Sequence, residues 1–160
     1  MTTGIGSAAT RKVMDRLAGP VDAGSAVGAL TEAGYEGAAM RAQNAAAELV
    51  ERAGAVRYPL VTVYCEKVVN DLKEKFRTFS GRVEIAIEVR HSQDRLEGLE
   101  EAIEGQTDAV TRALAASRGD WGDGMYYAGA YQVSFGRVAR GGKNFTQVAK
   151  VTFEIGVSKN

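Results

Sequence analysis

The chain has 160 residues, of which 45% are hydrophobic and 25% charged, and this balance favours a globular domain with a hydrophobic core over a disordered chain. The 20 basic and 20 acidic residues cancel, which argues against a dedicated nucleic-acid binder, since such proteins usually carry a clear basic excess. A single cysteine, Cys65, excludes an internal disulfide, and without a signal peptide or an apolar run of roughly 18 residues we expect a soluble, intracellular protein.

Residues 1–54 are rich in alanine and glycine and predict a helical N-terminal region that packs on the core or extends from it. The first predicted helix takes Ser7 as its N-cap and ends at the Gly-Pro pair 19–20. Glycines recur through residues 19–34, which we expect to form a flexible connection. Alanines at helical spacing predict a second helix over about residues 35–53, with small side chains that let a neighbouring element or subunit approach closely.

Two strands are predicted next. Residues 56–66 are dense in valine, leucine and tyrosine and predict a strand covered on both faces, with Pro59 at its start or at a sheet edge. Residues 82–90 alternate between apolar and polar, with Glu84 and Glu88 on the polar face. The segment between the two strands is ambiguous. The apolar face of the second strand is expected to be buried and consists of Val83, Ile85, Ile87 and Val89.

A long amphipathic helix is predicted directly after this strand, over about residues 93–117. Its large apolar residues recur on one stripe, and its glutamates lie largely on the opposite face. Ser92 is the natural N-cap, and Asp94 in the first turn complements the helix dipole. A strand that passes without a linker into such a helix predicts a unit in which the helix packs on the sheet.

The last third of the chain predicts a loop followed by a hairpin. Residues 118–124 form a turn-rich loop around the only tryptophan. Residues 125–138 and 145–158 have strand spacing and most simply form a hairpin with a basic, glycine-rich tip over residues 139–144. The predicted fold is therefore α+β: a small, mostly antiparallel sheet packed by the long helix. We expect one domain overall, with its core over residues 55–160.

No pattern of catalytic, cofactor-binding or metal-binding residues stands out. His91 is the only histidine, and although a serine and an aspartate lie nearby, neighbours at a strand-to-helix junction seldom have triad geometry. Cys65 lies in an apolar strand, where an inert buried thiol is expected. Asp120 and Asp123 lack the following glutamate of a calcium-binding loop. We therefore expect no enzyme, no cofactor and no metal site.

The basic hairpin tip allows two interpretations. It lacks the spacing of a phosphate-binding loop and a following helix, so nucleotide binding is not expected. The simplest interpretation is a solvated turn. The alternative is that Arg137, Arg140 and Lys143 contact a partner protein or a nucleic-acid backbone, and a ring of such tips strengthens a contact that is weak in one copy.

Four stretches together resemble the tail terminator (tail completion) proteins of long-tailed bacteriophages. RYPLVTVY, residues 57–64, is similar to the proline-marked first strand of that family, and VEIAIEV, residues 83–89, to its central strand. Residues 92–116 resemble its crossover helix, and the pair 131–138 and 145–157 resembles its terminal hairpin. The likeness covers the core domain, whereas the long Ala/Gly-rich N-terminal region departs from the short single helix of the family.

The resemblance implies a structural virion protein that closes the tail tube as a hexameric ring and joins the tail to the head. Its partners would be other copies of itself, the tail tube protein and a head-completion or connector protein. DNA would be passing cargo only, and no membrane would be involved. The expected location is the tail or neck of the virion and, during assembly, the host cytoplasm.

The residues expected to act in such a ring follow from their positions. Glu84 and Glu88 would line the lumen, where a negative wall does not hold passing DNA. Trp121 and Tyr126 are second choices for a subunit or tube contact, because aromatic residues are enriched in interfaces. The first choices are the residues of the hairpin tip, Arg140, Gly141, Gly142, Lys143 and Asn144.

Two alternatives stay open. The first is another head–tail neck component, such as a connector, which differs from a tail terminator mainly in which partner each face meets. The second is a small-ligand-binding module or enzyme with a pocket near His91, Asp120 and Asp123. It predicts that a ligand or metal raises thermal stability.

Overall fold

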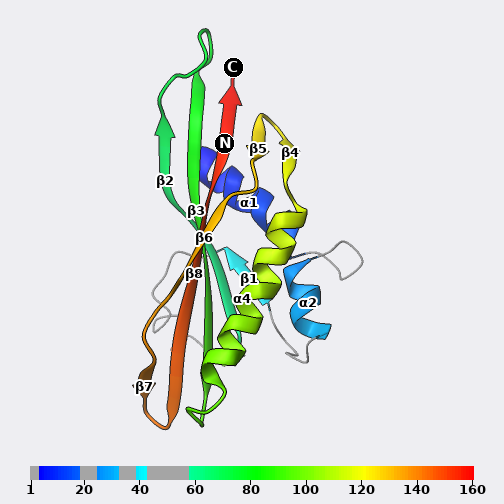
Figure 1. The fold of residues 1–160 in the computed structure, drawn as a ribbon. Helices are drawn as coiled ribbons and strands as arrows, with labels where there is room; N and C mark the ends of the chain where they lie inside the picture. Colours follow the sequence, from blue (N-terminus) through cyan, green and yellow to red (C-terminus); the bar gives the residue numbers. More distant parts are fainter. Residues whose placement is uncertain (1–3, 19–24, 33–38, 43–57) are drawn as a thin grey trace.

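The computed structural model describes residues 4–18, 25–32, 39–42 and 58–160 (Figure 1). In chain order, the described elements are α1 (Ile5–Leu17), α2 (Ala26–Glu32), β1 (Ala39–Ala42), β2 (Leu60–Asn70), β3 (Phe79–Gln93), α4 (Leu99–Ala116), β4 (Gly119–Gly122), β5 (Met125–Tyr127), β6 (Tyr131–Phe135), β7 (Ala139–Gly141) and β8 (Asn144–Lys159).

All eight described strands belong to one sheet, with the order β1-β2-β3-β8-β5-β4, and β6 and β7 also pair with β8. The β1–β2 pair is parallel, and every other pair among the described strands is antiparallel. β3 pairs with β8 along its full 15 residues, which corresponds to a ladder about 50 Å long. α1 packs on β2 and β3, and α4 packs on β3 and β8. The predicted α+β class is confirmed.

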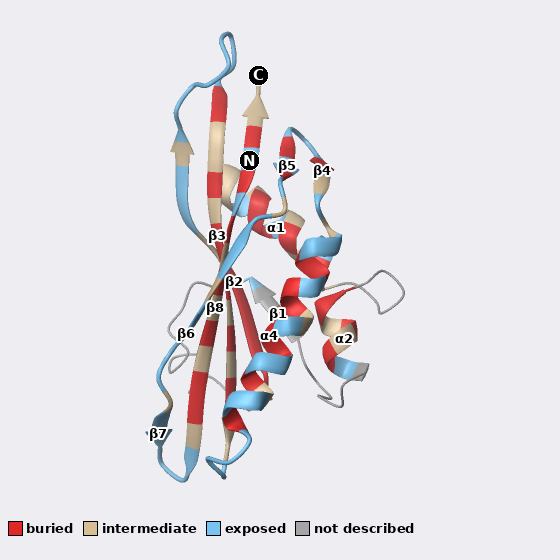
Figure 2. Ribbon diagram, in the orientation of Figure 1, coloured by how far each residue is buried: buried red, intermediate tan, exposed pale blue. Residues whose placement is uncertain are grey.

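The core lies between the helices and one face of the sheet. The alternation predicted for the central strand is confirmed, because all four apolar residues of that face are fully buried. They pair with buried residues of β8, so the two long strands share one apolar face (Figure 2). The helices complete the core with Ala9, Val13 and Leu17 from α1 and Ile103, Val110 and Leu114 from α4.

The alternate residues of the same strands form the other face of the sheet, which we call the open face. It includes Glu84 and Glu88 of β3 and Lys150, Thr152 and Glu154 of β8. The described helices pack on the apolar face. Most side chains of the open face are polar, but Leu60, Thr62 and Ala86 on it are buried.

The N-terminal region differs from its prediction in two places. α1 begins at Ile5 after an extended Gly4, so Ser7 lies inside the helix and is not its cap. The segment predicted as a flexible connection contains α2. The hydroxyl of Ser25 accepts a hydrogen bond of 2.9 Å from the backbone N–H of Gly28 and so caps this short helix.

The second predicted helix is wrong where the structure describes it. Residues 39–42 form β1, and the remainder of 35–53 lies outside the described residues apart from this strand. β1 runs parallel to β2, with Ala39 beside Leu60 and Ala42 beside Val63. Pairing with an available strand edge has overridden the helical preference of alanine, since such propensities are weak relative to tertiary contacts.

The predicted helix start at Ser92 is also wrong. β3 continues to Gln93, because β8 offers a partner along the whole strand, and α4 begins only after Gly98. Gly98 has a φ of 81°, a conformation that glycine adopts without strain. The side-chain amide of Gln93 donates hydrogen bonds to the carbonyl oxygens of Arg95 and Glu97, at 2.7 and 2.9 Å, and holds this turn.

The other strands are shifted or divided relative to their predictions. β2 begins at Leu60 and continues to Asn70, beyond the predicted end of its strand. The predicted loop around the tryptophan contains β4, which forms a hairpin with β5, and the strand predicted over residues 125–138 is divided into β5, β6 and β7. The closing hairpin is confirmed by the pairing of β7 with β8. None of the described helices has the length and apolar character needed to cross a membrane.

Candidate assembly surfaces

The β7–β8 tip is an exposed tight turn. Gly141 pairs with Asn144, which leaves Gly142 and Lys143 as a two-residue connection. Gly142 has a φ of 63°, as the tight turns of two-residue hairpins require. All four residues are exposed, so the predicted tip residues are accessible to a partner.

This tip carries positive charge that no described residue neutralises. The guanidinium of Arg140 lies 5.4 Å from the ring centroid of Phe145, in cation–π geometry. Within the described part of the chain, no carboxylate lies within salt-bridge distance of Arg137, Arg140 or Lys143. An acidic surface on a partner would find three available cations here.

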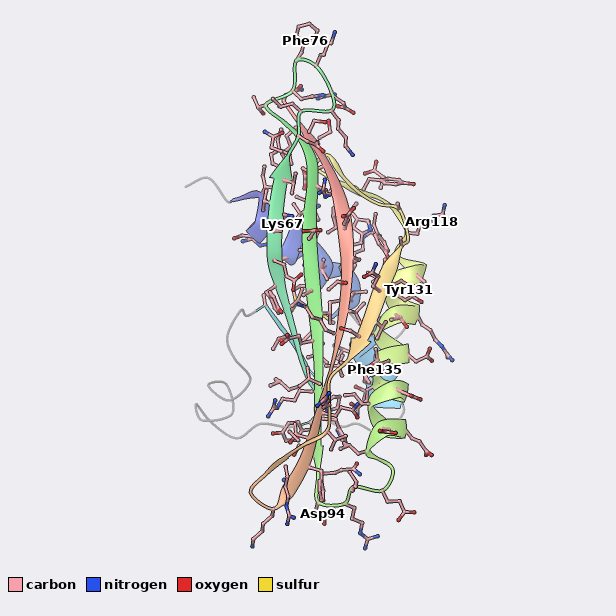
Figure 3. All side chains as sticks on the ribbon, turned by 60° about the vertical axis from the view of Figure 1, so that its left-hand side comes forward. Lys67, Phe76, Asp94, Arg118, Tyr131 and Phe135 are labelled. Atoms are coloured by element: carbon pink, nitrogen blue, oxygen red, sulfur yellow. The ribbon has the colours of Figure 1, made fainter. Side chains whose placement is uncertain are left out.

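The opposite end of the sheet carries a second exposed tip, the β2–β3 loop of residues 71–78. Phe76 is fully exposed there, and Leu72 is 58% exposed. Figure 3 places Phe76 at one end of the long strands and Asp94 at the other, the end near the β7–β8 turn in Figure 1. Sequence reasoning missed this surface because a phenylalanine among lysines is compatible with either burial or exposure. The position of Phe76 at the end of a hairpin leaves its side chain exposed.

Among the described strands, the sheet has unpaired edges on both of its lateral sides. β6 pairs there only with β8, so its outer side is unpaired. β1 pairs with β2 only as far as Val63, and no other described strand pairs with the outer side of residues 64–70 of β2. Figure 3 shows the two edges on opposite sides of the molecule, with Lys67 on β2 and with Tyr131 and Phe135 on β6. Unpaired edges readily pair with another chain.

The β6 edge exposes two aromatic side chains. Tyr131 is 42% exposed and Phe135 is 48% exposed. They pair with Phe153 and Ala149 of β8, so they belong to the face on which the helices pack. The sequence places both in a strand, but only the sheet topology puts that strand at an edge and leaves them partly uncovered.

Glu84 and Glu88 lie on the open face, and the carboxylate of each interacts with a neighbouring side chain. The Glu84 carboxylate is 3.9 Å from the Lys67 ammonium. The hydroxyl of Tyr64 donates a 3.0 Å hydrogen bond to Glu88. The pKa of Tyr64 is raised, first by burial of the phenol and then by this bond to a carboxylate.

The rest of the open face is equally mixed. Lys150 forms an ion pair with Glu66, whose hydrogen bond raises the lysine pKa. Arg82 lies 3.3 Å from Glu154 and 3.6 Å from Asp71. On β2, β3 and β8 the acids and cations of this face are equal in number, so the negative wall expected from Glu84 and Glu88 alone is not what these strands present. These residues are the acids Glu66, Glu84, Glu88 and Glu154 and the cations Lys67, Arg82, Arg90 and Lys150.

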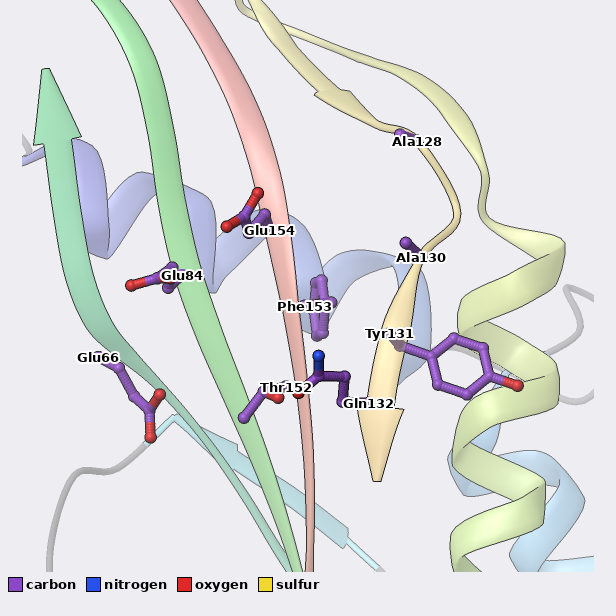
Figure 4. A pocket seen from close by; sticks show the side chains of 9 residues that line it. All are labelled: Glu66, Glu84, Ala128, Ala130, Tyr131, Gln132, Thr152, Phe153 and Glu154. Atoms are coloured by element: carbon purple, nitrogen blue, oxygen red, sulfur yellow. The ribbon is translucent and has the colours of Figure 1, made fainter. Parts of the chain in front are cut away.

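A shallow hollow of about 390 Å³ lies on this face between β2, β3, β8 and β6 (Figure 4). Glu66, Glu84 and Glu154 point toward it, but each of the three carboxylates already has a cationic neighbour. Among the described residues, no group of three or more histidine, cysteine or acidic side chains is arranged to hold a metal ion.

The two aromatic second choices lie in different environments. Trp121 is only 4% exposed, and its indole N–H donates a 2.6 Å hydrogen bond to the carbonyl oxygen of Ser117. Its ring packs 5.7 Å from that of Tyr127, so Trp121 is a core residue and not a surface contact. Tyr126 is 50% exposed and remains available to a partner.

The structure separates the residues of the alternative ligand pocket. His91 pairs with Gln147 of β8, whereas Asp120 pairs with Tyr126, which in turn pairs with Gly156 of β8. These two positions of β8 are nine residues apart in sequence, which corresponds to about 30 Å along an extended strand. A pocket shared by His91 and Asp120 is therefore excluded.

The side chains of His91 and Asp123 instead interact with structural partners near them. The His91 ring nitrogens lie 3.0 Å from the Gln106 side-chain nitrogen and 3.2 Å from the Gln93 side-chain oxygen. Burial lowers the pKa of His91. Asp123 forms a 2.8 Å ion pair with Lys12, and this hydrogen bond lowers the pKa of the carboxyl group.

Comparison with models of known protein families gives no match, and no curated protein sequence matches the chain. The features of this protein that indicate a function are therefore its surfaces: two exposed tips at the ends of the sheet and two unlike edges at its sides.

Proposed function

We propose that this protein closes a bacteriophage tail tube as an oligomeric ring and joins the tail to the head. The observation that carries the proposal is a pair of unlike edges that no other described strand covers, on opposite sides of one sheet: β6 on one side and residues 64–70 of β2 on the other. The resemblance of the core strands and hairpin to tail terminator proteins points to the same assembly.

Unlike edges favour a closed ring over a simple dimer. A contact between two different surfaces is heterologous, and it forms a closed ring when the rotation between neighbouring copies adds up to a full turn. A stable contact of this kind buries about 800 Å² on each partner. The exposed aromatic side chains on β6 would suit such a contact between subunits. Unpaired strand edges would add backbone hydrogen bonds to it.

The two ends of the sheet support a role between two partners. One end carries the apolar Phe76 in a loop that also holds cations, and the other carries the basic β7–β8 tip. In a ring whose axis follows the long strands, these ends would form its two rims. We assign the β7–β8 tip to the tail tube and the β2–β3 loop to the head-completion or connector protein.

A lumen formed by the open face would suit DNA that passes without being held. Its residues on β2, β3 and β8 carry acids and cations in equal number, and many of them are paired with one another. Such a face offers no excess of cations to bind phosphates. The protein would then reside in the virion neck, after assembly in the host cytoplasm.

The test combines solution mass with tube length. Light scattering of the purified protein, alone and with tail tubes, should give a closed oligomer near six copies. Adding the protein to polymerising tail tube protein should stop elongation, which negative-stain electron microscopy measures as shorter tubes with one capped end. Unchanged tube lengths with no protein on tube ends would refute the tail terminator role. Binding to portal-bearing heads in that case would assign the protein to the connector class.

A further inference from the structure

The β2–β3 loop of residues 71–78 carries one protruding aromatic side chain at an end of the long sheet. All residues of the loop are exposed, Leu72 to 58% and Phe76 to 100%. Figure 3 shows Phe76 at the extreme end of the molecule, beyond the paired part of β2 and β3. A fully exposed phenylalanine removes no apolar surface from water within its own chain. The side chain of Phe76 therefore contributes nothing to the core.

The two apolar residues of this loop both hold a backbone conformation that their side chains disfavour. Leu72 has a φ of 51° and Phe76 a φ of 67°, and both values lie in the left-handed region. A bulky residue is strained in this region, whereas glycine is not. Such strain persists only where the surrounding structure imposes it, and it is concentrated at sites that bind or react. The strain at Leu72 and Phe76 therefore points to a binding role for the loop.

Hydrogen bonds at the base of the loop hold its conformation. The side-chain oxygen of Asn70 accepts a 3.0 Å bond from the backbone N–H of Ser80, and its NH₂ group donates a 3.1 Å bond to the carbonyl oxygen of Thr78. The hydroxyl of Ser80 accepts a 3.1 Å bond from the backbone N–H of Glu74. The backbone N–H of Thr78 donates a 3.0 Å bond to the carbonyl oxygen of Lys159. Because β2, β3 and β8 all hold the loop, its tip needs little further ordering when it binds.

The charged side chains of the loop mostly pair with one another. The guanidinium of Arg77 lies 3.3 Å from the carboxylate of Glu74, and the ammonium of Lys73 lies 4.0 Å from the carboxylate of Asp71. Within the described part of the chain, no carboxylate lies within salt-bridge distance of Lys75, which precedes the phenylalanine. An anionic lipid surface is recognised by clusters of several basic residues. One unpaired cation beside a rigid aromatic ring instead favours a protein surface.

We propose that Phe76 is a preorganised anchor that enters an apolar pocket on the head-side partner of the ring, with acidic side chains at the pocket rim facing Lys75. This inference rests on the proposed function and specifies its contact with the head-completion or connector protein. Aromatic residues that fill a pocket of the partner dominate the affinity of many protein interfaces. In a ring, every copy presents one such anchor, so contacts that are weak singly combine into a strong one.

Substitution by glycine separates binding from folding. Phe76→Gly removes the ring and also relieves the strained backbone, so the melting temperature, ring formation and tube capping should be unchanged or improved. Capture of tailless, portal-bearing heads in a co-sedimentation assay should fall on the order of tenfold or more. Phe76→Leu is the matched control, because leucine keeps both an apolar side chain and the strain. It should bind heads more tightly than Phe76→Gly and unfold at a lower temperature.

Two further variants test the chemistry of the pocket. Lys75→Glu should weaken head capture, because it places a carboxylate against the acidic rim, whereas Lys143→Glu makes the same charge change at the other tip and should not. A photoreactive phenylalanine analogue at position 76, irradiated in the presence of heads, should label a head protein at a segment that contains apolar and acidic residues. A label found only on other copies of this chain would overturn the proposal.

The outcomes distinguish this inference from the proposed function. If the wild type caps tubes and captures heads but Phe76→Gly captures them equally well, the anchor is refuted and the proposed function is not. If heads are captured through Phe76 but tube length is unaffected, the anchor stands and the tail terminator role is refuted. If Phe76→Gly loses binding to vesicles of phosphatidylcholine and phosphatidylglycerol while head capture is unchanged, the loop binds lipid and the anchor is refuted. If the protein binds neither tubes nor heads, both proposals fall.

Discussion

Replacement of Trp121 by alanine should destabilise the folded monomer and leave the assembly surfaces in place. The side chain is 4% exposed, contacts Tyr127 and donates a hydrogen bond to Ser117, and the Arg16 guanidinium lies 5.8 Å from its ring centroid. Truncation of a buried tryptophan costs about 3–5 kcal/mol, because transfer free energy is lost and a cavity remains. Loss of the indole hydrogen bond accounts for about 1 kcal/mol of that sum.

The assay is urea unfolding followed by far-ultraviolet circular dichroism, at a concentration where the protein is monomeric. Domains of this size have a free energy of unfolding of about 5–15 kcal/mol, so Trp121→Ala should remove a large part of it. Trp121→Phe is the milder variant. Phenylalanine keeps most of the ring packing and should cost about 1–2 kcal/mol. Tyr126→Ala, at a half-exposed site, should stay within about 0.5 kcal/mol.

A specific result would contradict this reasoning. If Trp121→Ala unfolds within about 1 kcal/mol of the wild type and instead lowers the mass of the oligomer, the tryptophan acts at an interface, as the sequence alone predicted. The structural argument requires the opposite pattern: lower stability in the monomer, and an oligomer that is weakened only as far as the fold is.

Four further predictions concern the two tips, the buried histidine and a helical glycine. Arg140→Glu with Lys143→Glu should leave the melting temperature and the ring unchanged but abolish binding to tail tubes in a sedimentation assay, and tube binding that survives would remove the tip from the contact. Phe76→Ser should leave tube binding intact and weaken capture of heads, since the loop lies at the other end of the sheet. Burial holds the pKa of His91 below its ordinary 6.5, so the unfolded chain binds more protons and stability falls as the pH drops below about 6.5. His91→Gln should flatten that part of the melting-temperature profile in calorimetry, and an equally steep profile would contradict the assignment. Gly105→Ala should stabilise α4 by about 0.5–1 kcal/mol in urea unfolding, because nothing lies within 4 Å of the added Cβ and alanine favours helix, whereas a destabilised variant would show that this helix face is covered.

Local pattern was sufficient for the elements whose burial is set by their own period. The alternation of Val83, Ile85, Ile87 and Val89 and the apolar stripe of α4 identified the two surfaces that meet in the core. The closing hairpin was equally accessible, because a glycine-rich turn between two alternating segments has few other solutions. These signals suffice for the α+β class.

Strand pairing determined the elements that the local sequence pattern did not predict. Residues 39–42 became a strand because β2 offered an edge, and β3 continued past Ser92 because β8 ran beside it. The neighbouring residues in sequence predict neither the strand at residues 39–42 nor the continuation of β3, because backbone hydrogen bonds between strands depend on residues distant in the chain. The same limit explains the error at Trp121, whose burial depends on packing with α1 and β5.

The sequence by itself determined the periodic apolar faces, the zero net charge and the basic hairpin tip, because each is a property of residues close together in the chain. The tertiary structure decided which strands lie at the edges, which aromatic residues stay exposed and which charges are paired. These are relations between distant residues, fixed by one register of one sheet. Tyr131 and Cys65 stand in the same row of that sheet only because β3 and β8 lie between them.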